Sequence, residues 1–183
     1  LKVGDDDRYK DKLFVLIRAS ELCVSELTID RVLEELVTLI VQVITVDRCA
    51  LIALDDKTFE MNPRVVKSFT QSTRHAYSQR VIDFVVDHGN QASFTDVSQD
   101  RRLPGDGKHD MDVRSAMCVP INPGGGTIGV IYVDSITKSD LYKPDDLALL
   151  RAIANHAAVA LEGAALRGGE ARGRSLVPSM PRR

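Results

Sequence analysis

Residues 115–135, SAMCVPINPGGGTIGVIYVDS, decide the fold that this sequence predicts. Two extended, mostly apolar runs, 115–121 and 127–134, flank a turn rich in proline and glycine, which predicts an antiparallel hairpin. The alternating residues of the second run leave both of its faces partly apolar, so we expect a central strand that is covered on both sides. Pro120 has no N–H to donate, which indicates an edge or a bulge at the end of the first strand.

A long helix is predicted after this hairpin. Pro144 suits a first helical turn, and Asp145 and Asp146 favour the positive end of the helix dipole. The Ala- and Leu-rich run continues to about Leu166, and the glycine pair 168–169 is expected to end it.

The chain before the hairpin alternates between helical and extended patterns. Periodicity predicts, in order, helices over 10–27 and 29–44, strands over 49–54 and 64–69, a helix over 78–88 and a strand over 92–97. Residues 98–114 lack periodicity and predict a long loop. Strands joined by hairpins, with helices gathered at the ends, indicate an α+β fold with an antiparallel sheet. We expect one domain over 10–167, a linker over 1–9, and a disordered tail or a linker to an output domain over 168–183.

Composition excludes several classes of function. The net charge of −2 gives no basic surface for nucleic acid, and no apolar run approaches the length of a membrane span. Three cysteines, Cys23, Cys49 and Cys118, lie far apart without a CxxC pair, so neither a zinc site nor a disulfide framework is predicted. Free thiols favour a reducing, cytoplasmic compartment. A first residue that is Leu rather than Met suggests a piece of a longer chain.

Four segments, in this order and spacing, resemble GAF domains, which are regulatory modules of signalling proteins. They are TIDRVLEELVTLIVQVITVDRCALIALD (28–55), TDVSQDRR (95–102), VRSAMCVPI with IGVIYVDS (113–121 and 128–135), and DLYKPDDLALLRAIANHAAVAL (140–161). The resemblance covers 10–167. It implies a central antiparallel sheet with the terminal helices on one face and a ligand pocket on the other.

The resemblance also implies a function and a site. We expect a non-catalytic sensory domain of a bacterial-type signalling protein, in which a small molecule shifts helices that lead to an output domain. The positions expected on the pocket side are Phe69, Thr95, Asp96, Arg101, Arg114, Ser115, Met117 and Asp134.

Departures from known GAF subtypes limit the cofactors. The Asn-Lys-Phe-Asp-Glu signature of cyclic-nucleotide binders has no counterpart here, and no cysteine precedes a histidine as in members that attach a bilin. We therefore predict no cofactor, no metal site and no catalytic residue. Free methionine sulfoxide reductases share the fold and use clustered cysteines, whereas only Cys118 falls on an expected pocket-side strand.

Self-association is the remaining prediction. The last helix carries two apolar stripes, of which one covers the sheet and the other packs on the first helix or on a second subunit. We expect a homodimer through 10–27 and 145–166. Three functions stay open: a small-molecule sensor, a ligand-free dimerisation module whose pocket is filled by large side chains (Phe69, Phe84, Phe94, Met117), and a sulfoxide reductase that depends on Cys118.

Overall fold

The computed structural model describes residues 3–55, 58, 60–70, 77–105, 112–124 and 126–174, with side chains from residue 7 to residue 167. The elements in chain order are α1 (Val3–Cys23), α2 (Ile29–Val43), β1 (Arg48–Leu54), β2 (Met61–Ser68), α3 (Gln79–His88), β3 (Ala92–Phe94), β4 (Ser115–Ile121), β5 (Gly129–Ser135) and α4 (Pro144–Arg174). This order confirms the predicted α+β fold.

The described strands form one five-stranded antiparallel sheet in the order β2-β1-β5-β4-β3. The predicted hairpin is β4–β5, and β5 is the central strand, with every residue buried. Gly129 permits the close approach of β1 to β5, because a Cβ there would lie 2.6 Å from the carbonyl oxygen of Ile52. The short β3 pairs only with residues 116–118 of β4, so Pro120 lies beyond this ladder and the lack of its N–H costs nothing there.

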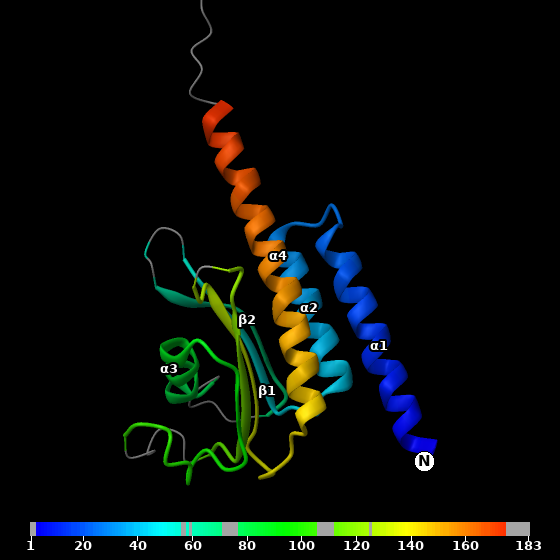
Figure 1. The fold of residues 1–183 in the computed structure, drawn as a ribbon, viewed down its shortest axis with the longest axis vertical. Coiled ribbons are helices and arrows are strands. Elements are labelled where there is room, and N and C mark those ends of the chain that lie inside the picture. The colour runs from blue at the N-terminus through cyan, green and yellow to red at the C-terminus, as the bar shows by residue number, and fades with distance from the viewer. Residues whose placement is uncertain are drawn as a thin grey trace, which may run out of the picture.

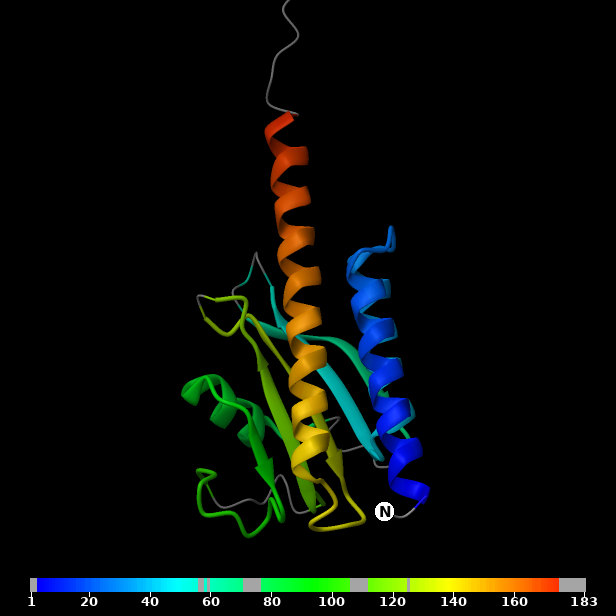
Figure 2. The ribbon, with the colours of Figure 1, turned by 45° about the vertical axis from the view of Figure 1, so that its right-hand side comes forward.

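The helices cover the two faces of the sheet unequally. Figures 1 and 2 show α2 and α4 against one face, α1 outside them, and α3 alone on the other face. The apolar stripe of α2 is buried and α1 packs on both α2 and α4. Ser78 caps α3 by accepting a hydrogen bond from the Val81 N–H, and Gly89 ends the helix at φ 64°.

The outer helices are longer than the sequence indicates. α1 begins at Val3, so most of the expected linker 1–9 is helical, and it ends at Cys23, before the predicted end at 27. α4 continues past the glycine pair 168–169 to Arg174. Glycine costs only about 1 kcal/mol per residue in a helix interior, and an established helix extends cooperatively. Residues 175–183 lie outside the described residues.

The sheet separates two cores. In the helix-side core, β-strand residues of one parity pack against α2 and α4; they include Cys49, Leu51, Met117, Val119, Ile131 and Val133. In the α3-side core, the residues of the other parity pack against α3 and β3; they include Ala50, Ile52, Ala116, Cys118, Val130 and Tyr132. This division follows from the alternation of side chains along a strand, and it decides which residues reach the predicted pocket side.

Candidate functional site on the α3 side of the sheet

Three polar side chains, Arg48, Tyr132 and Asp134, form a buried cluster on the α3 side, which we call the Arg48 cluster. Nε of Arg48 donates to both carboxylate oxygens of Asp134 at 3.0 Å, and its Nη2 also donates to Oδ2. The Tyr132 hydroxyl donates to the same Oδ2. Arg48 is 3% exposed, and Asp134 and Tyr132 are fully buried. Asp134 is therefore paired on both oxygens, as a buried carboxylate requires.

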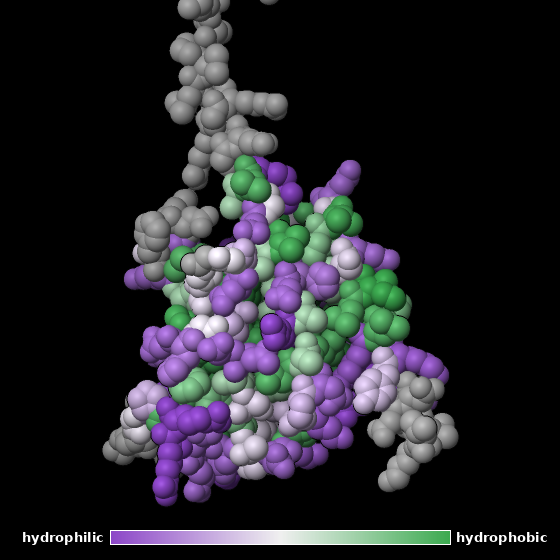
Figure 3. Space-filling view, viewed as in Figure 1, coloured by the Kyte–Doolittle hydropathy of each residue, from purple (hydrophilic) through white to green (hydrophobic). Residues whose placement is uncertain are grey.

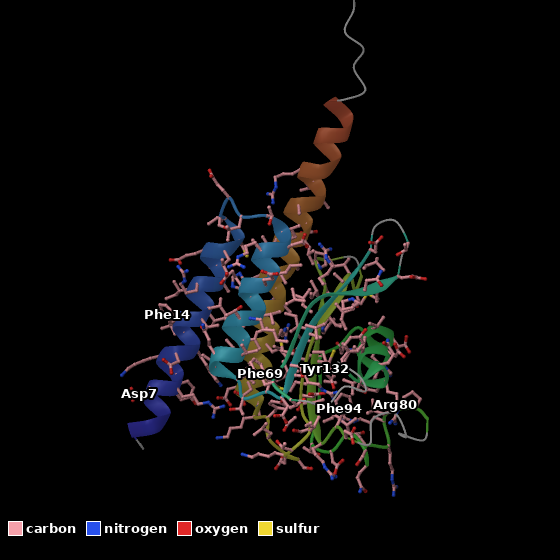
Figure 4. The ribbon with its side chains drawn as sticks, turned by 180° about the vertical axis from the view of Figure 1, so that it is seen from behind. Asp7, Phe14, Phe69, Arg80, Phe94 and Tyr132 are labelled. Carbon is pink, nitrogen blue, oxygen red and sulfur yellow. The ribbon has the colours of Figure 1, made fainter. Side chains whose placement is uncertain are left out.

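Strand register brings this cluster together. Arg48 in β1 and Asp134 in β5 are direct partners in the antiparallel ladder. Tyr132 precedes Asp134 by two residues and so points to the same face. Figure 4 labels Tyr132 and Phe94 between the sheet and α3.

Burial and pairing act in opposite directions on these groups. Burial raises the pKa of Asp134, and the hydrogen bonds and charge of Arg48 oppose that rise. Burial acts to lower the pKa of Arg48, but its hydrogen bonds and charge attraction to Asp134 outweigh burial and raise it. Burial also raises the pKa of Tyr132 well above its usual value. The hydrogen bonds from Arg48 to both oxygens of Asp134 indicate an ion pair, and burial favours a neutral tyrosine beside it.

Five of the eight predicted site residues lie at one end of the sheet. The Phe69 N–H donates to the carbonyl of Asp47, next to Arg48, and the Arg114 N–H donates to the carbonyl of Ser135, next to Asp134. Ser115 pairs with Ser135 in the ladder, and the Thr95 carbonyl accepts from the Asp140 N–H of the neighbouring loop. The five residues are Phe69, Thr95, Arg114, Ser115 and Asp134, of which Asp134 belongs to the Arg48 cluster.

Other predicted residues have different surroundings. Met117 and Ser115 lie one residue out of phase with Ala116 and Cys118, so their expected pocket-side positions are wrong. Met117 is fully buried in the helix-side core, and the Ser115 hydroxyl donates to the carbonyl of Lys138. The Asp96 carboxylate accepts from the N–H and the hydroxyl of Ser98, which turns the chain after β3. Arg101 is exposed, and Phe69 is 62% exposed. That these eight residues bind a ligand stays a prediction.

The loop after β3 is held by arginines on both of its sides. Arg102 pairs with Asp100, donates to the carbonyl of Ser93 at 2.9 Å, and places its guanidinium 4.6 Å from the centre of the Phe94 ring. Arg80 of α3 donates to the carbonyl of Leu103 at 3.2 Å. These contacts fix residues 95–105 beside the α3-side core. Residues 106–111 of the predicted loop lie outside the described residues.

Asp47 organises the same end of the sheet. Its Oδ2 accepts from the Ser135 hydroxyl and the Ile136 N–H, both at 2.8 Å, and from the N–H and hydroxyl of Thr137. Burial acts to raise the pKa of Asp47, but these hydrogen bonds outweigh burial and lower it. The start of β1 is thus tied to the loop between β5 and α4.

The cysteines are separated by the sheet. Cys118 is buried in the α3-side core, Cys49 is buried in the helix-side core, and Cys23 lies half-buried on α1. Burial raises the pKa of all three thiols, to about 12 for Cys49. Since the thiolate is the reactive form, these environments oppose nucleophilic or redox chemistry.

Sequence reasoning missed Arg48 and Tyr132. Arg48 falls within the GAF-like segment 28–55, and Tyr132 within the alternating run 127–134, but neither pattern marks them as site residues. One signal was available: Tyr132 and Asp134 share a face of the central strand, and a buried carboxylate needs a cationic or donor partner. The sequence alone does not indicate which of the arginines supplies it.

The sequence model of the GAF domain family matches residues 28–161. This chain belongs to the GAF domain family. The match leaves α1 outside the family's common part, whereas the sheet, α2, α3 and most of α4 lie inside it.

Solved structures agree with the GAF fold. The GAF domain of a phosphoenolpyruvate-protein phosphotransferase from Coxiella burnetii is 16% identical, with 87% of this chain and 98% of that chain covered and a TM-score of 0.70. The corresponding Acinetobacter domain is 15% identical, with coverages of 86% and 97% and a TM-score of 0.68. A free methionine-R-sulfoxide reductase from Neisseria meningitidis, bound to its substrate, is 17% identical, with coverages of 84% and 89% and a TM-score of 0.67. At these identities the likeness shows the fold alone.

Three further findings concern curated proteins, membrane spans and metals. No match was found among curated proteins. Within the described residues, no helix is long and apolar enough to cross a lipid bilayer, and no group of three or more His, Cys, Asp or Glu side chains is placed to hold a metal ion.

Proposed function

We propose that this GAF domain is a non-catalytic regulatory module of a signalling protein, which pairs with a second copy through α1 and thereby controls a linked output domain. The observation that carries the proposal is the apolar character of α1 on two opposite sides. Val15, Ala19 and Leu22 are buried against the domain. On the opposite side, Leu13, Phe14 and Ile17 are 60%, 60% and 51% exposed.

The exposed side of α1 forms a continuous surface. Figure 3 shows a hydrophobic patch over the middle of α1, and Figure 4 shows Phe14 directed away from the domain. Exposed apolar groups that gather in one patch mark an interaction surface more often than single ones do. On α4, Val159 and Leu166 are also exposed, seven residues apart on one side of the helix, which is compatible with the interface predicted over 145–166.

Ion pairs connect the pairing helix to the output helix. The Lys12 ammonium, 8% exposed, contacts Asp145 and Asp146 at the start of α4, each at 2.9 Å. Arg8 also contacts Asp146, at 2.8 Å. Because α1 and α4 share this junction, a change in the packing of α1 shifts α4, and α4 continues beyond the sheet (Figure 1).

The mass of the protein in solution tests the proposal. Light scattering over a concentration series is expected to give a dimer for the unmodified chain and a monomer for the Phe14→Glu, Ile17→Glu variant, because buried glutamates oppose association. Val66→Glu, an exposed substitution on β2, is the matched control and should remain dimeric. A monomer for the unmodified chain at tens of micromolar would contradict the proposal.

Small-molecule sensing is a second candidate function. The Arg48 cluster places several polar groups at one end of the α3-side core, and ligand sites combine an apolar lining with a few such groups. Native mass spectrometry of gently purified protein tests this candidate. The Arg102→Ala variant releases the loop beside the α3-side core. A bound mass that disappears in this variant supports small-molecule sensing. The absence of a bound mass in the unmodified chain favours the ligand-free module.

The reductase alternative has a direct test. The buried, protonated state of Cys118 opposes it, and turnover of free methionine sulfoxide that is lost in Cys118→Ser would establish it.

A further inference from the structure

We propose that the two α1 helices pair in antiparallel orientation, about a two-fold axis that crosses α1 between Val15 and Leu16. In this arrangement Phe14 packs on Ile17 of the second copy, and Lys10 lies opposite Glu21 of the second copy. The inference rests on the proposed pairing through α1 and adds its orientation and register.

A line of exposed residues along α1 carries the inference. These residues recur at alternating steps of three and four, the spacing of a coiled-coil seam, and none is covered by the domain. They are Asp7, Lys10, Phe14, Ile17 and Glu21 on α1, and Val24 directly after its last residue. The two residues in the middle are apolar, a cation lies on their N-terminal side, and an anion lies on their C-terminal side.

In a two-fold symmetric pair, the order of charges along α1 favours one orientation of the two helices over the other. In a parallel pair each seam residue meets its own copy, so Lys10 faces Lys10, Glu21 faces Glu21 and Asp7 faces Asp7. Like charges at such positions are destabilising. In the antiparallel pair Lys10 and Glu21 give two contacts of opposite charge around an apolar centre, and Asp7 lies opposite Val24 instead of a second aspartate. The charge pattern therefore selects the antiparallel arrangement.

The existing contacts of the charged residues allow this change of partner. Lys10 lies 3.5 Å from Asp7, and Glu21 lies 2.6 Å from Arg18, both as ion pairs within α1. All four side chains are more than half exposed. Exposed pairs of this kind contribute little, so Lys10 and Glu21 can share or exchange partners at small cost.

The position of α1 also leaves room for a second domain. α1 is the outermost helix of the helical layer in Figure 2, and its seam lies opposite the side that packs on α2 and α4. An antiparallel partner would place its own sheet on the far side of the α1 pair.

Disulfide trapping tests the orientation in the full chain, with Cys23→Ser as the background because Cys23 lies on the same helix. We would prepare Lys10→Cys and Glu21→Cys as separate proteins and oxidise them mildly, alone and mixed. In the antiparallel pair, positions 10 and 21 are directly opposite, whereas in a parallel pair they are about 16 Å apart along the axis. A disulfide needs Cα atoms within about 7 Å. We expect a cross-linked dimer only from the mixture.

The other outcomes separate the two proposals. Cross-linking of Lys10→Cys with itself, or of Val24→Cys with itself, would establish a parallel pair and overturn the orientation while leaving the pairing through α1 intact. No cross-link in any sample, together with a monomeric mass, would remove both.

Charge exchange gives an independent measurement without cysteine. Lys10→Glu places glutamates opposite each other in the antiparallel pair, and we expect the dimer Kd to rise about tenfold. Lys10→Glu with Glu21→Lys restores opposite charges and should return the Kd to its original value. In a parallel pair the two single charge reversals and their combination all leave like charges facing, so equal Kd values for the three variants would overturn the proposal.

Discussion

The two sides of the sheet are stabilised by different chemistry. The helix-side core is built almost entirely from aliphatic side chains of α2, α4 and the strands, whereas the α3-side core contains the ionised Arg48 cluster among its apolar residues. Apolar packing depends on volume and tolerates replacement by residues of similar size. A buried ion pair depends on particular partners. The α3 side should therefore be the more sensitive of the two to single polar changes.

The same contrast appears in two tyrosines whose hydroxyl groups are both buried. On the α3 side the Tyr132 hydroxyl donates to Asp134. On the helix side the ring of Tyr142 packs against the core, and its buried hydroxyl has no hydrogen-bond partner among the described residues. Burial raises the pKa of Tyr142, so this hydroxyl stays neutral. The Tyr132 hydroxyl therefore contributes to stability, whereas the burial of the Tyr142 hydroxyl lowers it.

The largest effect is expected on the α3 side, from Arg48→Ala. The substitution leaves the Asp134 carboxylate buried without its cation, so the free energy of unfolding should fall by about 3–5 kcal/mol. The loss should be smaller at acidic pH, where the carboxyl is protonated and carries no buried charge. Urea titrations at several pH values measure both effects.

A paired replacement serves as the control for Arg48→Ala. Arg48→Met with Asp134→Leu removes both charges and should recover most of the loss. A loss below about 1 kcal/mol in the single variant would show that the Arg48 cluster does not distinguish the two sides.

Leu33→Ala tests the helix side. Leu33 is fully buried in that core, and its truncation should lower the free energy of unfolding by about 2–5 kcal/mol through lost burial and a cavity. This loss should not depend on pH, since no charge is exposed or buried. Val66→Thr, an exposed change on β2 outside the proposed interface, should change stability by less than about 0.5 kcal/mol. A loss for Leu33→Ala that varies with pH would contradict the expected difference between the two cores.

Asp47→Ala tests the junction of the two sides at the end of the sheet. Loss of its hydrogen bonds to Ser135 and residues 136–137 should cost about 2 kcal/mol, because solvent replaces only some of them. The pKa of Asp47 is lowered by folding, so its contribution is present above the unfolded pKa and is lost as pH falls through the folded pKa. Acid titration followed by circular dichroism should thus show a shallower decline for Asp47→Ala. Asp87→Ala, an exposed change on α3, should match the unmodified chain.

The smallest effects come from removing the two tyrosine hydroxyls one at a time. Tyr132→Phe should lower the free energy of unfolding by about 1–2 kcal/mol, because Asp134 loses a donor. Tyr142→Phe should leave it unchanged or raise it by up to about 1 kcal/mol, because no hydrogen bond to a described residue is lost and a buried polar atom is removed. Thermal melts of both variants measure the difference. Equal losses would indicate that the two hydroxyls have equivalent surroundings.

Local patterns predicted most of the elements. The hairpin of β4 and β5, the amphipathic α2, and α3 all lie where the periodicity indicates. The predicted ends of α1 and α4 were wrong. In α4, weak helix breakers do not prevent a long helix from extending. At the site, Asp134 was found from its strand, whereas Met117 was assigned to the wrong face by one residue of register.

What the sequence by itself determined is local: the order of helices and strands, the central position of β5 and the resemblance to GAF domains that the family match confirms. What only the tertiary structure decided is the meeting of distant residues. Arg48 reaches Asp134 because β1 and β5 are neighbours in register, although 86 residues separate them. The exposed side of α1 became visible only once α2 and α4 were seen to cover the other side. Periodicity sets which residues share a face, but contacts between remote segments decide what each face meets.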